Sequence, residues 1–302
     1  MPRSADVAIG VDIGGTKVMA GVLTRHGPVS RLWSETPRES AAALLATVLR
    51  LVRQLVGELP PASTIAVGVG SAGQIDPATG TVRSSTHTLP LAGLPLGERL
   101  ASALGRPVQV LNDGDAAALA EALGGAALGC RSSVTVMLGT GIGAGVYTDG
   151  RLLQGAWGRA AEIGHLQLQA TGPLCACGRR GCAEALASGQ ALNAAAWAMG
   201  LADARALFHA ARQGATQPAR AVATAARWTA RLLQQVVVCY DPDRIVLGGS
   251  LITGTDGFYL ERIRQAFRPT PYLHPLPPLV PAGYGPDAVW VGAALAALSA
   301  QG

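Results

Sequence analysis

The first part of the chain combines two hydrophobic periods. Residues 7–24 (VAIGVDIGGTKVMAGVLT) alternate as strands do, with a turn at Gly14-Gly15, and a third strand is expected near Val29–Glu35. Apolar residues then recur at helical spacing from Ser40 to Leu59, which predicts an amphipathic helix. The chain is therefore expected to open with three strands followed by a helix.

Strands and helices continue to alternate up to residue 125. Residues 64–73 (TIAVGVGSAG) predict a buried strand that runs into a glycine turn, and residues 107–113 (PVQVLND) predict another strand. A short helix is expected at Leu94–Leu104, between these two strands. Residues 115–125 (DAAALAEALGG) predict a helix that a Gly-Gly pair stops.

The strand, glycine turn and strand of the N-terminus then recur at residues 133–155 (SVTVMLGTGIGAGVYTDGRLLQG), followed by a tight Asp-Gly hairpin. The elements expected after it are helices at Leu186–Met199, Asp203–Gln213 and Gln217–Cys239, a strand at 244–250, a helix at Gly257–Phe267, a proline-rich loop at 269–281 and a last helix from Ala288. This alternation predicts an α/β protein in which one supersecondary unit opens each of two domains.

Composition narrows the function classes. The chain has 302 residues and is 49% hydrophobic but only 4% aromatic, so alanine, valine and leucine must fill the core. The net charge of +5 comes from interspersed residues, which favours a solvated surface over a nucleic-acid patch. The longest apolar runs, such as Val289–Leu298, are shorter than the roughly 20 residues of a membrane span. With no apolar stretch of leader length at the start, we expect a cytoplasmic protein without disulfides.

Glycine-rich turns are candidate phosphate-binding sites. In Asp12–Lys17 (DIGGTK), glycines would let backbone amides approach a phosphate, while Thr16 adds a hydroxyl and Lys17 a positive charge. Leu138–Gly145 (LGTGIGAG) follows the same logic. Each could equally be an ordinary hairpin turn, but their equivalent places in a repeated unit favour a shared function. The turn at Leu247–Ser250 (LGGS) could approach a nucleoside, although a plain turn is the simpler interpretation.

Asp113 stands where a predicted strand ends and a helix starts. It could cap the helix, a role worth about 1 kcal/mol. It could instead be a general base at the carboxyl edge of the sheet, where ligands of α/β proteins bind. Spacing alone weights these two roles evenly.

Three cysteines and a histidine fall within 18 residues, at His165, Cys175, Cys177 and Cys182. These are the ligand types of a closed, tetrahedral zinc site, and in a reducing compartment a disulfide is the poorer explanation. Free buried thiols are the alternative.

Together these segments resemble the ROK family (repressors, open reading frames and kinases), which includes sugar kinases of the actin-like ATPase fold. The resemblance covers nearly the whole chain, through DIGGTK at 12–17, LNDGDAAALAE at 111–121 and LGTGIGAG at 138–145. Most specific are EIGH at 162–165 and CACGRRGCAE at 175–184. It implies an α/β fold of duplicated, ribonuclease H-like domains with a cleft between them, and an ATP-dependent kinase that also binds Mg²⁺ and structural Zn²⁺.

The resemblance also implies a role for each matching residue. Asp113 would be the catalytic base that takes the proton of the attacking hydroxyl. The sugar-binding residues would be Gly73, Asn112, Asp113, Glu162, His165 and Glu184. The residues near ATP, with Asp12 near its Mg²⁺, would be Asp12, Gly14, Gly15, Thr16, Lys17, Gly139, Thr140, Gly141, Gly143, Gly248 and Gly249. The zinc ligands would be His165, Cys175, Cys177 and Cys182, and zinc would hold the loop that carries Glu162 and Glu184.

The chain departs from the family pattern in two places. Ser71-Ala72-Gly73 replaces the usual proline-glycine turn, and residues 86–93 (THTLPLAG) lack an asparagine and a tryptophan that are common there. One sugar contact is therefore missing, or His87 or Thr88 supplies it. This leaves the identity of the sugar open.

The expected function is transfer of the γ-phosphate of ATP to the 6-hydroxyl of a hexose, with glucose as the default and N-acetylmannosamine as the alternative. A catalytically silent sugar-binding protein is a further hypothesis. A repressor is disfavoured because the first strand begins by about Val7 and leaves no room for a DNA-binding helix-turn-helix. We expect a smaller domain at 1–113 joined by a helix at 288–302, a larger domain at 114–287, a homodimer or higher homo-oligomer, and no nucleic-acid or membrane partner.

Overall fold

Two five-stranded sheets and the helices around them form the protein, and the computed structural model describes residues 7–61, 63–85 and 90–300. The first sheet has the strand order β3-β2-β1-β4-β7. Its strands are β1 (Val7–Ile13), β2 (Lys17–Thr24), β3 (Gly27–Glu35), β4 (Ile65–Ser71) and β7 (Val108–Asn112). The first three strands are antiparallel neighbours, and β4 and β7 continue parallel to β1.

The second sheet repeats this arrangement in the order β10-β9-β8-β11-β12. Its strands are β8 (Ser132–Leu138), β9 (Ile142–Thr148), β10 (Arg151–Leu152), β11 (Arg244–Gly248) and β12 (Leu279–Pro281). Again the first three are antiparallel and the last two are parallel to the first. The repeated unit expected from the sequence is therefore confirmed, and it extends to the whole sheet.

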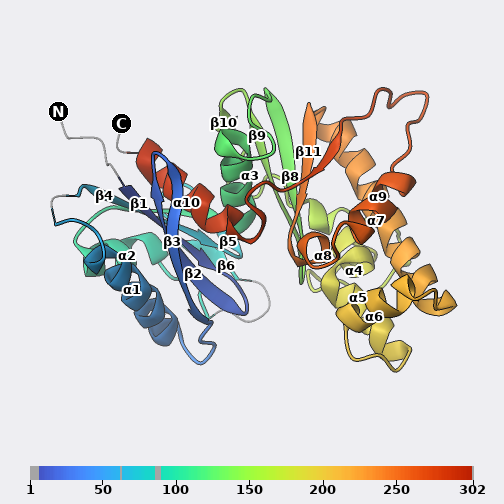
Figure 1. Cartoon of the computed structure of the whole chain (residues 1–302), viewed down its shortest axis with the longest axis horizontal. Helices are drawn as coiled ribbons and strands as arrows, with labels where there is room; N and C mark the ends of the chain where they lie inside the picture. Colours follow the sequence, from blue (N-terminus) through green and yellow to red (C-terminus); the bar gives the residue numbers. More distant parts are fainter. Residues whose placement is uncertain (1–6, 62, 86–89, 301–302) are drawn as a thin grey trace.

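Helices form three layers around the two sheets (Figure 1). One face of the first sheet packs against α1 (Ala41–Gly57) and α2 (Leu96–Leu104). Its other face packs against α10 (Ala288–Ser299) and α3 (Asp113–Gly124), and α3 also contacts β8 and β9. The helices α3 and α10 thus lie between the sheets, which explains why α10 is apolar on all sides.

The remaining helices cover the far face of the second sheet, and their apolar side chains form a core together with that sheet. They are α4 (Ala183–Ala187), α5 (Gly189–Ala198), α6 (Ala204–Arg212), α7 (Thr216–Tyr240), α8 (Ser250–Thr253) and α9 (Phe258–Ala266). Two short 3-10 turns complete the chain, η1 (Ile163–His165) and η2 (Gly285–Asp287).

Some elements differ from those that the sequence predicts. The helix expected at Leu186–Met199 is divided into α4 and α5, because Ser188 leaves the helical conformation and caps α5 by accepting a hydrogen bond from the Ala191 amide. The proline-rich loop contains β12, and residues after β4 form the two-stranded pair β5 (Gln74–Ile75) and β6 (Val82–Ser84). These strands are too short for periodicity to reveal them.

We propose that the domains divide as the sequence suggests, at residues 1–113 with 288–302 and at 114–287, since each range supplies one sheet. Within the described ranges, no helix combines the length and the apolar character that crossing a lipid bilayer requires.

The helix α10 lies so close to the first sheet that its backbone contacts glycines in the strands directly. A Cβ atom on Gly68 of β4 would lie 1.8 Å from the Ala293 carbonyl oxygen, and one on Gly10 of β1 would lie 1.8 Å from the Trp290 oxygen. A Cβ on Gly292 would lie 1.7 Å from the Ala116 oxygen in α3. Because these obstacles are backbone atoms, only glycine allows the layers to approach so closely.

Gly68→Ala should therefore lower the free energy of unfolding by about 1–3 kcal/mol or more, because the layers must separate. Gly57→Ala, at the end of α1, is the matched control, since no atom lies within 4 Å of its added Cβ. It should leave stability unchanged or raise it by up to about 1 kcal/mol. Urea unfolding of both variants measures the difference, and equal midpoints would contradict the packing argument.

Candidate active site

The parallel register of the first sheet brings polar residues to one edge. Ile13 of β1 lies beside Ser71 of β4, and Ser71 lies beside Asn112 of β7. Asp12 and Asp113 therefore lie near each other although about a hundred residues separate them in sequence. This is the carboxyl edge at which ligands of parallel sheets bind.

Asn112, not Asp113, caps α3. The Asn112 side-chain oxygen accepts hydrogen bonds from the amides of Gly114 (2.8 Å) and Asp115 (3.4 Å), and its amide group donates to the Gly73 carbonyl (2.8 Å). Asp113 is the first residue of the helix, and its carboxylate accepts a hydrogen bond from the adjacent Gly114 amide (2.9 Å). The capping role considered for Asp113 is thus taken by its neighbour.

Asp12, Asp113, Asp115 and Glu162 form a carboxyl cluster at this helix start, in which the charge of one group raises the pKa of its neighbour. The pKa of Asp113 is raised to about 6, mainly by desolvation and also by the charge of Glu162, while hydrogen bonds from the Gly114 amide and the Asn112 side chain oppose the rise. Desolvation also raises the pKa of Glu162, which His165 lowers and Glu184 raises. Burial and the charge of Asp113 raise the pKa of Asp12 to about 8. A base with a pKa near 6 suits proton transfer at neutral pH.

Asp115 belongs to the same cluster, although no motif in the sequence points to it. Its side chain is buried in the first turn of α3 and accepts a hydrogen bond from the Gln154 amide (3.2 Å). Burial raises the pKa of Asp115 to about 7, with the charges of Asp113 and Glu162 adding to the rise. A carboxyl two residues from a predicted base is easily taken for helix surface, because only the tertiary structure buries it.

The first glycine turn connects β1 to β2. The Gly14 amide donates to the Lys17 carbonyl (3.0 Å), and the Gly14 carbonyl accepts from the Thr36 hydroxyl (2.7 Å). The Arg38 guanidinium donates to the Gly15 carbonyl (2.8 Å), while the Lys17 ammonium lies 5.1 Å from the centre of the Trp33 ring. Arg38 is thus a second cation at the turn that the motif did not reveal.

The second glycine turn, between β8 and β9, lies beside the glycine pair at the end of β11. Gly139 donates to the Gly141 carbonyl (3.0 Å), and Gly143 lies just inside β9. Gly249 has a φ of 84°, and a Cβ there would lie 2.4 Å from the Leu138 carbonyl oxygen. The parallel pairing of β8 with β11 therefore joins the two motifs that the sequence shows a hundred residues apart.

A pocket of about 740 Å³ opens beside these turns. Its lining includes Gly139, Thr140 and Ser250 from the turns, Arg205, Phe208, His209 and Arg212 from α6, and the polar residues Asn193 and Asp203. The pocket is large enough for a nucleoside, and polar groups surround an aromatic side chain, as in sites that bind small molecules. No motif pointed to α6, because its residues meet the turns only in the folded protein.

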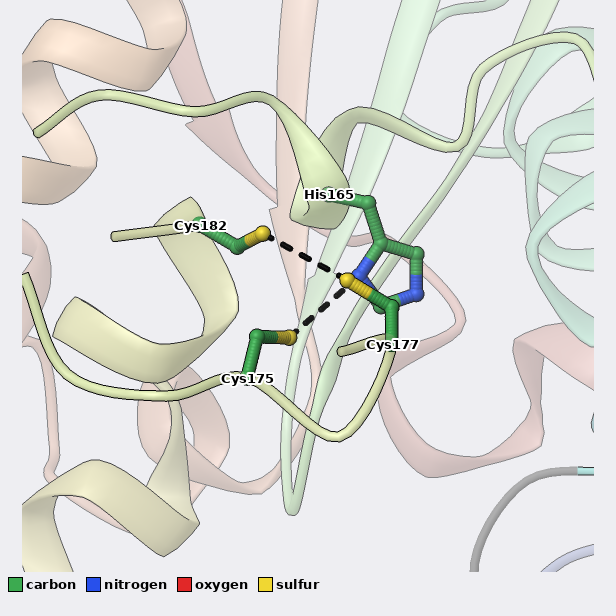
Figure 2. Close-up of side chains that lie close together, drawn as sticks. All are labelled: His165, Cys175, Cys177 and Cys182. Atoms are coloured by element: carbon green, nitrogen blue, oxygen red, sulfur yellow. Dashed lines mark hydrogen bonds between the residues drawn. The ribbon is translucent and has the colours of Figure 1, made fainter. Parts of the chain in front are cut away.

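His165 and the three cysteines come together as predicted (Figure 2). Their ligand atoms all lie within 4.8 Å of one another, with 3.6 Å between Cys175 Sγ and His165 Nδ1 and 3.6 Å between the sulfurs of Cys177 and Cys182. A tetrahedral zinc ion with Zn–S bonds of about 2.3 Å requires sulfurs about 3.8 Å apart. The donor set and its spacing therefore fit a metal ion. Figure 2 shows the second ring nitrogen of His165 directed away from the sulfurs.

The sugar contact assigned to His87 or Thr88 lies outside the described residues.

Next to Glu162, Ala161 is buried and has a φ of 63°, in the left-handed region that residues with a side chain rarely adopt. Such backbone strain is typical of functional sites.

Comparison with known proteins places this geometry in context. The profile of the ROK family matches residues 8–300. An N-acetylmannosamine kinase of Yersinia pseudotuberculosis is 35% identical over 95% of this chain and 97% of its own length. A glucokinase of Streptomyces coelicolor is 33% identical over 87% of each chain.

A solved structure resembles the whole chain. The ROK family glucokinase from Streptomyces griseus, in complex with glucose and AMPPNP, superimposes with a TM-score of 0.86 at 30% identity, over 97% of this chain and 99% of that one. The relatives thus include sugar kinases of two substrate classes.

The buried carboxyls predict an unusual dependence of stability on pH. A carboxyl group whose pKa is higher in the folded than in the unfolded protein stabilises the fold fully at pH values below its unfolded pKa of 3.8. This stabilisation is lost as the pH rises through the pKa of the folded protein. Without Mg²⁺, the free energy of unfolding should therefore fall between about pH 4 and pH 8, given pKa values of about 6, 7 and 8 for Asp113, Asp115 and Asp12.

Asp115→Asn should flatten this decline between about pH 4 and pH 7, because the amide does not ionise and still accepts from Gln154. Asp256→Asn, at a side chain that is 84% exposed, is the control and should leave the decline unchanged. Urea unfolding at several pH values measures both. A slope that Asp115→Asn does not alter would show that this carboxyl is hydrated in the folded protein.

Proposed function

Because this chain belongs to the ROK family, and has the two-domain actin-like ATPase fold of ROK sugar kinases, we propose that it transfers the γ-phosphate of ATP to the 6-hydroxyl of a hexose. The observation that carries the proposal is the placement of Asp113. Its carboxylate is free of the capping role, its pKa is raised to about 6, and two glycine turns lie at the ends of the equivalent first strands, β1 and β8.

In this mechanism Asp113 accepts the proton of the attacking hydroxyl as the hydroxyl oxygen bonds to the γ-phosphorus and the bridging oxygen leaves with ADP. Asn112, Glu162, His165 and Glu184 orient the sugar through its other hydroxyls, and the Gly73 carbonyl, held by Asn112, shapes the same side of the site. Orientation by fixed groups supplies much of the rate enhancement in phosphoryl transfer.

The nucleotide would lie with its phosphates between the two glycine turns and its nucleoside in the pocket beside Thr140 and Ser250. Backbone amides of the turns would donate to phosphate oxygens. Asp12 would hold Mg²⁺, which neutralises phosphate charge when bound. The pKa of Asp12, about 8 without a cation, would fall as the ion binds.

Glucose is the substrate that we propose first, with N-acetylmannosamine as the alternative favoured by the relative at 35% identity. Both substrates are tested by measuring ATP turnover with glucose, mannose, fructose, allose, N-acetylglucosamine and N-acetylmannosamine. If no sugar supports turnover but one binds, the chain is a silent sugar-binding protein.

The homodimer expected from the family resemblance remains a prediction.

Asp113→Asn should lower kcat by at least about 100-fold, because the amide cannot accept the proton. The variant keeps the size of the side chain, so sugar binding by calorimetry should stay within a few-fold of wild type. A coupled ADP assay with the best sugar of the panel measures kcat. Turnover within tenfold of wild type would remove Asp113 as the base.

We further propose that the His165 cluster binds one structural zinc ion per chain, since zinc prefers three thiolates and an imidazole at this spacing. Cys177→Ser should lower the zinc content and weaken sugar binding. Cys239→Ser, at an exposed cysteine outside the cluster, is the matched control and should alter neither. Metal analysis of protein purified without added zinc provides the measurement, and wild type without zinc would disprove the assignment.

A further inference from the structure

Three hydrogen bonds join residues 184–190 to the second glycine turn. Glu184 Oε2 accepts from the Ile142 amide (2.9 Å). The Gly189 amide donates to the Gly139 carbonyl (2.8 Å), and the Gln190 amide donates to the Thr140 carbonyl (3.1 Å). Every residue from 139 to 142 except Gly141 is therefore bonded to the start of α4 or α5.

Gly141 contributes by having no side chain. A Cβ atom there would lie 2.4 Å from Glu184 Oε2, so the carboxylate lies directly against the turn. The hydrogen bond from Ile142 uses one carboxylate oxygen, and a carboxylate has a second oxygen to offer a sugar hydroxyl. Glu184 can thus contact the turn and the sugar at once.

The same segment starts in the metal cluster. Cys182 immediately precedes α4 and is its N-cap residue. The next residue, Ala183, donates its amide to the Leu166 carbonyl (2.9 Å), and Leu166 directly follows His165. One residue therefore separates a cluster cysteine from the carboxylate that holds the turn.

The α4 helix is too short to be stable by itself. It has five residues, whereas isolated helices shorter than about 12–15 residues are marginal in water. Its position comes from packing on α7, from Cys182 at its N-cap, and from the bonds that Glu184, Gly189 and Gln190 make to residues 139–142. Because Cys182 and Glu184 belong to the same first turn of α4, a change in the cluster acts directly on the residue that bonds the glycine turn.

We propose that Glu184 is a positioning residue that couples the metal cluster to the second glycine turn, so that zinc and nucleotide each strengthen the binding of the other. This inference rests on the proposed function, because it takes the turn to be a phosphate-binding loop. Zinc orders Cys182 and α4, Glu184 then fixes the Ile142 amide, and the remaining amides of the turn are held ready for phosphate. Since Ile142 is already bonded to Glu184, the carboxylate acts on the shape of the turn and adds no donor.

Coupling of this kind is reciprocal. If zinc tightens nucleotide binding by some factor, nucleotide must tighten zinc binding by the same factor. A structural metal that only stabilises its own loop would leave both affinities independent.

The test measures the zinc dissociation constant by competition with a zinc-selective chromophoric chelator, without sugar, in the presence and absence of saturating Mg²⁺–AMPPNP. In wild type the nucleotide should tighten zinc binding about tenfold. Glu184→Ala should reduce this factor to less than about twofold, because the bond to Ile142 is lost. Glu184→Gln should retain it, because the amide oxygen still accepts from the Ile142 amide.

Glu162→Gln is the matched control, since Glu162 lies near the cluster but makes no hydrogen bond to the turn among the described contacts. It should keep the wild-type factor. If Glu184→Ala does not fold, Glu184→Asp, whose side chain is one methylene shorter, replaces it with the same expectation.

The outcomes separate the two proposals. Wild type that binds zinc but no AMPPNP by calorimetry would overturn the proposed function. Wild type that binds AMPPNP with an unchanged zinc affinity would overturn the coupling alone. Coupling of wild-type size in Glu184→Ala would show that the backbone bonds of Gly189 and Gln190 transmit it without Glu184.

Discussion

The parallel pairing of β1, β4 and β7 is the constraint on which the site depends. Because their residues are in register, Asp12, Ser71 and Asn112 end at the same edge, and α3 begins where β7 stops. A shift of one residue in this register would turn Asp12 to the other face of the sheet. The packing of α10 against Gly10 of β1 and Gly68 of β4 supports this register from one face of the sheet.

The second sheet uses the same register for a different purpose. Pairing of β8 with β11 brings the glycine turn after Leu138 next to Gly249, and the pocket beside them is closed by α6. The first sheet gathers carboxylates and the second gathers backbone groups. Because α3 packs on both sheets, Asp113 stands at the junction of the two halves.

Function and stability oppose each other in the carboxylate cluster. Burying Asp12, Asp113 and Asp115 close together disfavours their charged forms, which is a cost to folding at neutral pH. The cost is tolerated because the cap by Asn112 and the bond from Gln154 hold the helix start in place. Carboxyl groups with raised pKa values are the result.

The sequence by itself determined most of the local features. Period-two and helical patterns predicted most strands and helices, the repeat predicted two related halves, and the His165 cluster was predictable because its four ligands fall within 18 residues. Only the tertiary structure decided which distant residues meet: Arg38 with Gly15, Asp115 with Gln154, Glu184 with Ile142, and α6 with the second glycine turn. Periodicity records which face of an element is buried, but not which partner buries it, because that choice depends on strand register and on layer packing across the whole chain.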